Sequence, residues 1–218
     1  MSSIYGEAHR GLQDKFETRR LADRLEAMTV KDFMDEQDQG FVSTRDMFFL
    51  STVDQHGRPT VSYKGGDPGF IKVIDDRTIA FPCYDGNGMY LSMGNVSANP
   101  EVGILFIDFE VPHRMRLQGR ASIQAQDPLV EAYHEAQFVV RVAISQTWVN
   151  CPRYIHRYKK LDPSRYVPRQ DCETPLAEWK RIDAVHDALA PSDDGRVEKA
   201  GGVLTMDEYY EKAAKGEA

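Results

Sequence analysis

Residues 48–64 have the sequence FFLSTVDQHGRPTVSYK, and this stretch best predicts the fold class. An apolar run, Phe48–Val53, is followed by DQHG and then by a second run, Thr60–Lys64. Gly57 supplies the positive φ that a tight hairpin connection needs. The stretch therefore predicts two antiparallel strands joined by a short turn.

Similar short apolar runs continue along the chain, separated by turns such as DDR at residues 75–77. Further strands are expected at Phe70–Ile74, Thr78–Pro82, Val102–Phe109, Met115–Ile123 and Phe138–Ile144. Short turns join antiparallel neighbours, and several such strands in series favour a barrel. The predicted fold class is mainly β (α+β), with flanking helices.

Helical patterns lie on both sides of this β region. Residues 10–29 carry apolar side chains at three- and four-residue steps, which predicts one amphipathic helix. A second apolar stripe runs over residues 176–189. We expect an N-terminal helical extension (1–46), a barrel (47–160) and a C-terminal helical extension and tail (161–218).

Composition limits the classes of partner. The 218 residues carry a net charge of −7, which argues against a nucleic-acid or anionic-membrane binder. No apolar run is long enough to span a membrane, and the N-terminus has no signal-peptide pattern, so we expect a cytoplasmic protein. The three cysteines and six histidines show no metal-ligand spacing, so no metal site is predicted.

Residues 84–95, YDGNGMYLSMGN, form a polar, glycine-rich connection before the next strand. Glycines let backbone N–H groups approach a ligand, and a helix beginning at Met89 or Tyr90 adds its positive dipole end. The pattern is neither a dinucleotide fingerprint nor a P-loop. It predicts an anion site, with an ordinary connection as the alternative.

Two strands carry polar groups on one face. Alternation places Thr60, Ser62 and Lys64 together, which would suit a phosphate-bearing ligand lying across the sheet. Arg114, Arg116 and Gln118 alternate in the same way along a later strand, and could bind a phosphate or a polar ring edge. In each case a solvent-facing strand is the alternative.

The order of the motifs adds a family resemblance. The motifs are Ser-x-Lys-Gly (62–65), Pro-Gly-Phe (68–70), Asp-Asp-Arg-Thr (75–78), Gly-Asn-Gly (86–88), Asn-Pro-x-Val-Gly-x-Leu-Phe (99–106) and Arg-x-x-Gly-Arg-Ala (116–121). The series resembles the pyridoxamine 5′-phosphate oxidase-like family of FMN-binding split barrels, more closely its uncharacterised members than the oxidase itself. The resemblance covers residues 48–123 and is weaker over residues 150–155.

The resemblance implies a six-stranded antiparallel split β-barrel, homodimeric, with one FMN in each of two clefts at the dimer interface. Carried over by position, the cofactor-binding residues are Ser62, Tyr63, Lys64, Gly65, Tyr84, Asp85, Gly86, Asn87, Ser92, Asn95, Arg116, Gln118, Arg153 and Tyr154. Arg153 and Tyr154 would come from the second subunit.

The chain departs from the oxidase at two points. The oxidase carries a Ser-Arg-Lys run before the helix, whereas this chain has Tyr90-Leu91-Ser92. Lys64, Arg114 and Arg116 are then the nearby cations for a phosphate. The oxidase's C-terminal Arg-Leu-x-Pro motif is also missing, which argues against pyridoxamine phosphate as the substrate.

The function expected from these features is that of an FMN-dependent oxidoreductase. Hydride would pass between a small-molecule substrate, or a nicotinamide donor, and flavin N5, and no side-chain catalyst is nominated. The alternatives are a flavin-binding or sensing protein without turnover, or a split barrel that binds haem or a deazaflavin.

Overall fold

The computed structural model describes residues 4–124 and 126–217. The chain divides into two compact units, Met1–Leu161 and Asp162–Ala218. The first unit contains a seven-stranded antiparallel sheet in the order β2-β1-β5-β6-β7-β4-β3. Its strands are β1 (Met47–Val53), β2 (Pro59–Gly65), β3 (Lys72–Asp75), β4 (Thr78–Cys83), β5 (Glu101–Asp108), β6 (His113–Gln124) and β7 (Phe138–Val149).

Each of the seven ranges that the sequence predicted to be a strand forms one. The count of six that the family resemblance implied is therefore one strand too few. The sheet is not closed, since β2 and β3 are its two edges. β3 also begins later than expected, because Phe70 and Ile71 turn into the core instead of pairing in the ladder.

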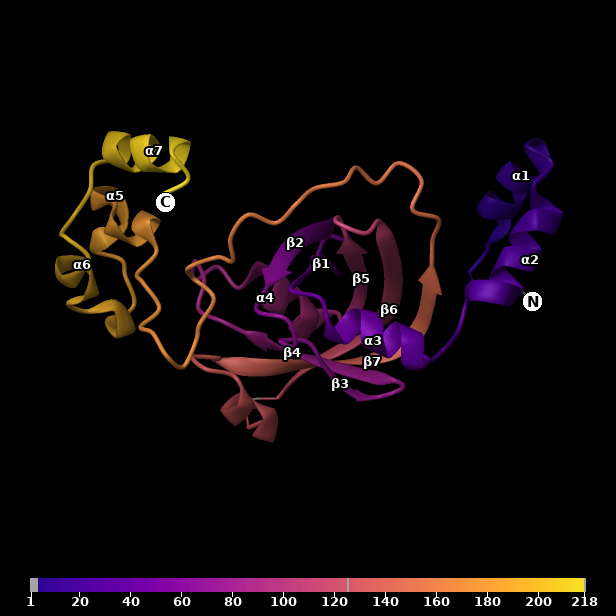
Figure 1. The fold of residues 1–218 in the computed structure, drawn as a ribbon, viewed down its shortest axis with the longest axis horizontal. Helices are drawn as coiled ribbons and strands as arrows, with labels where there is room; N and C mark the ends of the chain where they lie inside the picture. The colour runs from indigo at the N-terminus through magenta and orange to yellow at the C-terminus, as the bar shows by residue number, and fades with distance from the viewer. Residues whose placement is uncertain (1–3, 125, 218) are drawn as a thin grey trace. The chain divides into compact units, whose positions relative to one another are not determined.

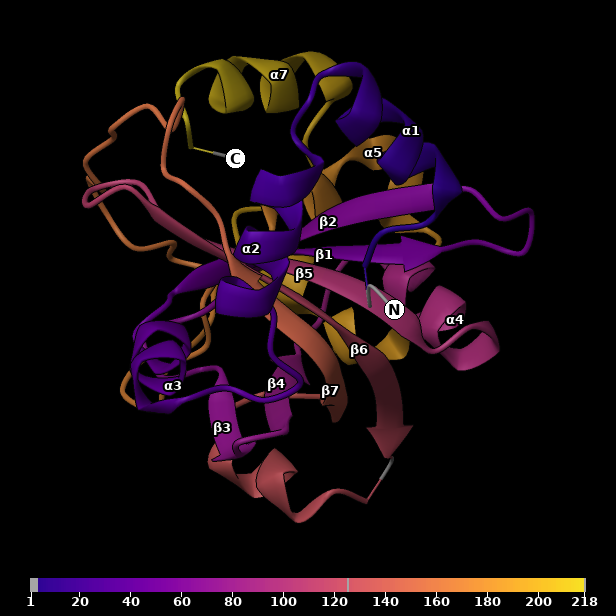
Figure 2. The same ribbon diagram turned by 90° about the vertical axis from the view of Figure 1, so that its right-hand side faces the viewer.

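Alternation along the strands separates an inner from an outer face. In β1 the side chains of Phe48, Leu50 and Thr52 are buried, whereas those between them are partly exposed. The Phe48 ring packs at 4.9 Å from Phe81 and 5.6 Å from Phe106, centroid to centroid. Figure 1 shows β1, β2, β5 and β6 arching over β3, β4 and β7, and Figure 2 shows how β2, β1, β5, β6 and β7 lie in order. The inner face is the hydrophobic core.

Two helices position the edges of this core. α4 (Leu91–Ala98) packs against β1 and β6 and buries Met93 and Val96, so the helix predicted in this part of the chain is confirmed. α3 (Glu36–Ser43) is preceded by its N-cap residue, Asp35, whose side chain accepts hydrogen bonds from the N–H groups of Gln37 and Asp38. This is the usual way of satisfying free donors at a helix N-terminus. A 3₁₀ turn, η1 (Pro128–Ala132), precedes β7.

The helix predicted over residues 10–29 is two helices, α1 (Glu7–Lys15) and α2 (Arg19–Thr29). The chain breaks at Glu17, whose φ of 56° is left-handed and incompatible with a continuous right-handed helix. After α2, Lys31 exchanges two backbone hydrogen bonds with Thr147 of β7. None of the helices in the described part of the chain is long and apolar enough to cross a membrane.

The second unit is helical and partly held by buried charges. Its elements are η2 (Glu178–Arg181), α5 (Asp183–His186), η3 (Pro191–Asp193), α6 (Arg196–Lys199) and α7 (Met206–Ala214). Lys180 Nζ lies 2.8 Å from Asp193 Oδ2, and both side chains are buried. The apolar stripe over residues 176–189 is interrupted at Ile182, which lies in extended backbone.

Candidate functional site

A cavity of about 220 Å³ opens where the ends of β2 and β4 meet α4. It is bordered by the loop that follows β4. The lining residues are Tyr63, Lys64, Gly65, Phe70, Phe81, Pro82, Cys83, Tyr84, Asp85, Gly86 and Met93. Six of these, from β2 and from the glycine-rich connection, are residues that the sequence predicted to be cofactor ligands.

Lys64 is the cation of this cavity. It pairs with Phe48 across the β1–β2 ladder, so its side chain starts on the inner face of the sheet. Burial lowers the pKa of Lys64, and no ion pair to it is found among the described residues. A partly buried ammonium without a carboxylate favours binding of an anionic group.

Tyr63 reaches the cavity from the other side of β2. It begins on the outer face, where its ring packs edge-on against Phe49 with centroids 6.1 Å apart. A Cβ on Gly65 would lie 2.7 Å from the Tyr63 ring, so only glycine leaves room for the ring to pass over the backbone there. Because β2 is an edge strand, Tyr63 connects the outer face with the cavity mouth.

Hydrogen bonds from α4 hold the polar inner face of β1 and β2. Ser92 Oγ donates to Ser62 Oγ at 3.0 Å, and Asn95 Nδ2 donates to Thr52 Oγ1 at 3.1 Å. Thr52 Oγ1 is in turn 3.0 Å from Thr60 Oγ1. Ser62, Ser92 and Asn95 therefore position α4, and none of them belongs to the cavity wall.

The glycine-rich connection forms one wall of the cavity. Tyr84, Asp85 and Gly86 line it, whereas Asn87 lies beyond and accepts the N–H of Met89 at 3.1 Å. Burial raises the pKa of Tyr84 and that of the Cys83 thiol, so both groups stay protonated at neutral pH. The thiol donates to Tyr84 O at 3.8 Å, and both groups line the cavity as neutral side chains.

The structure places Arg116 and Gln118 away from this cavity. The ladder pairs Tyr63 with Phe49, Phe49 with Leu105, and Leu105 with Arg116, so Arg116 lies on the outer face, three strands from Tyr63. At about 4.8 Å per strand the separation is about 14 Å. Gln118 follows on the same face. One copy of the chain therefore does not bring Arg116 and Lys64 together.

The outer face of the sheet carries its own set of polar side chains. Arg116 Nη1 donates to Asn150 Oδ1 at 2.5 Å. The neighbouring Arg114 has a buried Nε atom with no hydrogen-bond partner among the described residues. A buried donor without a partner is uncommon and costs free energy. Two guanidinium groups, of Arg114 and Arg116, and the Asn150 amide thus lie together on this face.

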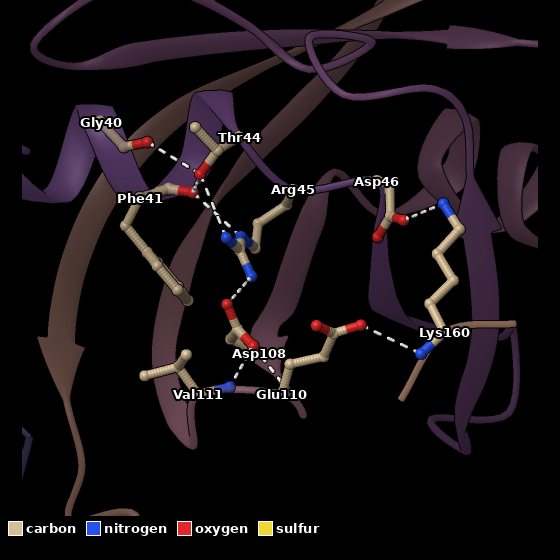
Figure 3. Close-up of polar contacts among 9 residues, drawn as sticks. All are labelled: Gly40, Phe41, Thr44, Arg45, Asp46, Asp108, Glu110, Val111 and Lys160. Carbon is tan, nitrogen blue, oxygen red and sulfur yellow. Dashed lines mark hydrogen bonds and ion pairs between the residues drawn. The ribbon is translucent and has the colours of Figure 1, made fainter. Parts of the chain in front are cut away.

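Arg153 and Tyr154 lie on the segment after β7, which has neither helix nor strand over residues 150–161. Tyr154 is exposed and has a left-handed φ of 72°. Farther along, Lys160 N donates to Glu110 Oε1 at 3.0 Å, and Lys160 Nζ lies 2.6 Å from Asp46 Oδ2 (Figure 3). Neither Arg153 nor Tyr154 lines the cavity of its own chain.

The ion pair between Lys160 and Asp46 lies beside the cavity. Asp46 O accepts the N–H of Gly66, so Lys160 fastens the segment next to the Gly65 end of β2. A second ion pair, Arg45 Nη1 to Asp108 Oδ2 at 2.6 Å, joins the end of α3 to the β5–β6 turn (Figure 3). Of the two contacts, the one at Asp46 lies next to a strand that lines the cavity.

Five residues of the wall were not among the predicted cofactor-binding residues: Phe70, Phe81, Pro82, Cys83 and Met93. Their types are those of ordinary core residues, and the pattern of alternation assigns them only to the interior. The glycine pair 65–66 was the sequence signal for Phe70. In the structure a Cβ on Gly66 would lie 2.4 Å from the Phe70 ring, so the ring needs a glycine at this position.

The model of a protein family described as pyridoxamine 5′-phosphate oxidase matches residues 34–165. This is more than half of the 218 residues, and the chain belongs to that family. A comparison with curated proteins finds no match.

Solved structures show similarity over most of their own length. HupZ from Group A Streptococcus is 19% identical over 58% of this chain and 100% of its own, with a TM-score of 0.45. An FMN-binding protein from Syntrophomonas wolfei is 13% identical over 64% and 97%, with a TM-score of 0.41. HutZ, the haem storage protein from Vibrio cholerae, is 20% identical over 53% and 93%, also with a TM-score of 0.41.

Proposed function

We propose that the chain is an FMN-dependent oxidoreductase whose two cofactor sites lie between two copies of the chain. The observation that carries the proposal is the separation of the cations that were predicted to bind the phosphate. Lys64 is in the cavity, whereas Arg114 and Arg116 are on the outer face. Two copies that pack through their outer faces would give each cavity the arginines of the other copy.

The size of the cavity supports this arrangement. Ligand sites usually enclose about 300–1,000 Å³. The cavity of one copy measures about 220 Å³ and opens at Tyr63, which is 62% exposed and stands at the boundary with the outer face. A second copy placed there would deepen the cavity. A two-fold axis would make both sites equivalent.

The residues present fit FMN. Lys64 and the partner's Arg116 would hold the phosphate. The aromatic side chains of Tyr63 and Tyr84 would lie against the flavin ring. FMN, when bound, supplies two-electron hydride chemistry at its N5 atom.

The protonation states of Cys83 and Tyr84 are compatible with hydride transfer. The Cys83 thiol and the Tyr84 phenol stay protonated because burial raises the pKa of each, so neither acts as a base at neutral pH. Hydride transfer to or from a flavin requires no side-chain base. The chain's task is then to hold, orient and shield the ring.

Mixing two variants tests the shared site. Lys64→Ala and Arg116→Ala should each weaken FMN binding by at least about tenfold. When the two are co-expressed, about half of the dimers are mixed and each restores one intact site, so about a quarter of all sites should bind FMN with the affinity of the wild type. Arg120→Ala is a matched control, because Arg120 is an exposed arginine of the same strand that is ion-paired with Glu101.

No recovery of FMN in the co-expressed variants would overturn the shared site. Full FMN affinity in both single variants would overturn the assignment of the site itself. Stopped-flow mixing with NADH, NADPH or amines separates an enzyme from a flavin-binding protein without turnover, because fast reduction is expected only of the enzyme.

A further inference from the structure

The helical hairpin formed by α1 and α2, which we call the arm, carries its apolar side chains at the surface. None of the residues that the structure describes in these two helices is buried. The helices are joined by charged side chains such as Arg10 and Asp23, whose Nη1 and Oδ1 atoms lie 2.6 Å apart. The large apolar side chains, 46–69% exposed, are Leu12, Phe16, Leu21, Leu25 and Met28. Helices of 9 and 11 residues are marginal without an apolar face packed on something, so we expect the arm to pack against another surface.

The edge strand β2 presents a matching apolar surface. On its outer face Val61 is 69% exposed and Tyr63 62%. β2 ends the described sheet, and proteins usually cover an apolar edge strand because its free backbone groups invite further pairing. Tyr63 also lines the cavity. A helix placed along β2 would therefore cover both this edge and the mouth of the cavity.

The pairing register shows which copy can supply that helix. One row of ladder partners crosses the outer face, in the order Tyr63, Phe49, Leu105, Arg116 and Trp148. In the proposed function Arg116 of one copy reaches the cavity of the other copy, which opens at Tyr63. A two-fold axis that runs along the strands between β1 and β5 places each Arg116 over the partner's Tyr63, since both residues stand at equal distances from that axis.

The same two-fold axis places the arm of one copy beside β2 of the other. Trp148 is one strand beyond Arg116, so it would lie about 4.8 Å outside the partner's β2. The chain leaving the arm is the next position in this direction, because Lys31 exchanges two backbone hydrogen bonds with Thr147 of β7. The arm thus begins about 10 Å from the partner's β2, a spacing across which side chains of neighbouring elements pack.

The arm is farther from β2 of its own copy. Within one copy it begins five strand positions from β2, or about 24 Å, whereas the 11 residues of α2 span about 16 Å. The positive and negative side chains of the arm are equal in number. An anionic membrane surface therefore gains no net attraction from it. The second copy is the occupant that the register favours.

We propose that the arm of each copy packs its apolar side chains along β2 of the other copy and closes the mouth of that copy's cavity. The inference rests on the proposed function, because it uses the two-fold axis that brings Arg116 to the partner's cavity. It adds a contribution of residues 7–29 to a site whose other groups come from the sheet and from the loop before α4.

Cross-linking between copies tests this contact. In a background of Cys151→Ser and Cys172→Ser, one chain carries Leu25→Cys and a second chain, with a longer tag, carries Val61→Cys. A short bismaleimide should join the two chains of different length. Ser122→Cys in place of Val61→Cys is the matched control, because Ser122 is an exposed residue at the far end of β6 and should give no such product.

A charge in the arm tests its effect on the site. Leu21→Glu should raise the dissociation constant of the dimer by at least about tenfold, since it brings a charge into an apolar contact. FMN binding should weaken with it, because the site needs both copies. Ala27→Glu adds the same charge to α2 outside the stripe of Leu21, Leu25 and Met28, and should change neither quantity.

No cross-link between the chains would overturn the proposal, and so would a cross-link that forms within a single chain carrying both substitutions. Monomers that float with phosphatidylcholine vesicles would also overturn it, by assigning the arm to a lipid surface. If Leu21→Glu keeps the dimer and the FMN affinity of the wild type while Lys64→Ala weakens FMN binding, the arm fails and the proposed function stands. A cross-linked dimer that binds no FMN would support the arm and overturn the proposed function.

Discussion

Replacing Lys64 by methionine should separate stability from cofactor binding. Burial lowers the pKa of Lys64, and no ion pair offsets its charge within the described residues. The empty protein therefore carries the cost of a poorly solvated cation. Methionine keeps most of the apolar stem without the charge, so Lys64→Met should raise the melting temperature of the FMN-free protein.

The pH dependence has a definite sign. Because the pKa of Lys64 in the folded protein lies below its ordinary value of 10.5, the unfolded chain binds the proton more tightly than the folded one. The cost is then fully present below the folded pKa and is relieved as the pH rises through it towards 10.5. The stability gained by Lys64→Met should be present at neutral pH and fade over that alkaline window.

Lys64→Met should weaken FMN binding, although it stabilises the FMN-free protein. A hydrogen bond to a charged group contributes about 1.5–3 kcal/mol, so the variant should bind FMN roughly 10- to 150-fold more weakly. Calorimetric melting of the empty protein and titration of FMN fluorescence measure the two effects. Lys72→Met is the control, because Lys72 is exposed on β3 outside the cavity. A Lys64→Met protein that melts lower and keeps its FMN affinity would refute the reasoning.

Three further predictions concern the framework of the site. Asp127→Asn should lower the free energy of unfolding by about 1–3 kcal/mol, because buried Asp127 accepts two hydrogen bonds from Arg141. The Arg141 guanidinium lowers the pKa of Asp127 from its ordinary value of 3.8. The loss of stability in Asp127→Asn should therefore be complete above pH 3.8 and shrink as the pH falls through the lowered pKa. Urea unfolding at several pH values measures this dependence. Gly119→Ala should cost about 1–3 kcal/mol in the same assay, because its Cβ would lie 2.4 Å from Ala143 O, whereas Gly103→Ala, with its nearest neighbour at 3.7 Å, should cost little. Equal costs for the two glycines would contradict the packing argument. Dilution until the copies separate should release FMN, and retention of FMN by monomers in sedimentation would contradict a shared site.

The local patterns of the sequence predicted the strands well. Alternation placed Thr60, Ser62 and Lys64 on one face of β2, and the ladder pairs them with the buried face of β1. Such patterns depend on only a few neighbouring residues. The break at Glu17 had no such signal, because a glutamate in left-handed backbone is set by its surroundings and not by its type.

The relation between faces of distant strands was not predictable in this way. Alternation grouped Arg116 with Gln118, but only the pairing register shows that Arg116 lies on the face opposite to that of Lys64. A shift of one residue in one ladder would have exchanged the faces. The sequence therefore grouped the candidate residues strand by strand, and their division between two faces required the structure.

The visible absorption spectrum of the freshly purified protein, with the extracted chromophore weighed by mass spectrometry, tests the central claim most directly. The account predicts a flavin spectrum and a chromophore of the mass of FMN, in a protein that sediments as a dimer. A colourless monomer whose melting temperature is unmoved by added FMN would contradict it. A haem or deazaflavin chromophore would also contradict it, by assigning the site to a different cofactor.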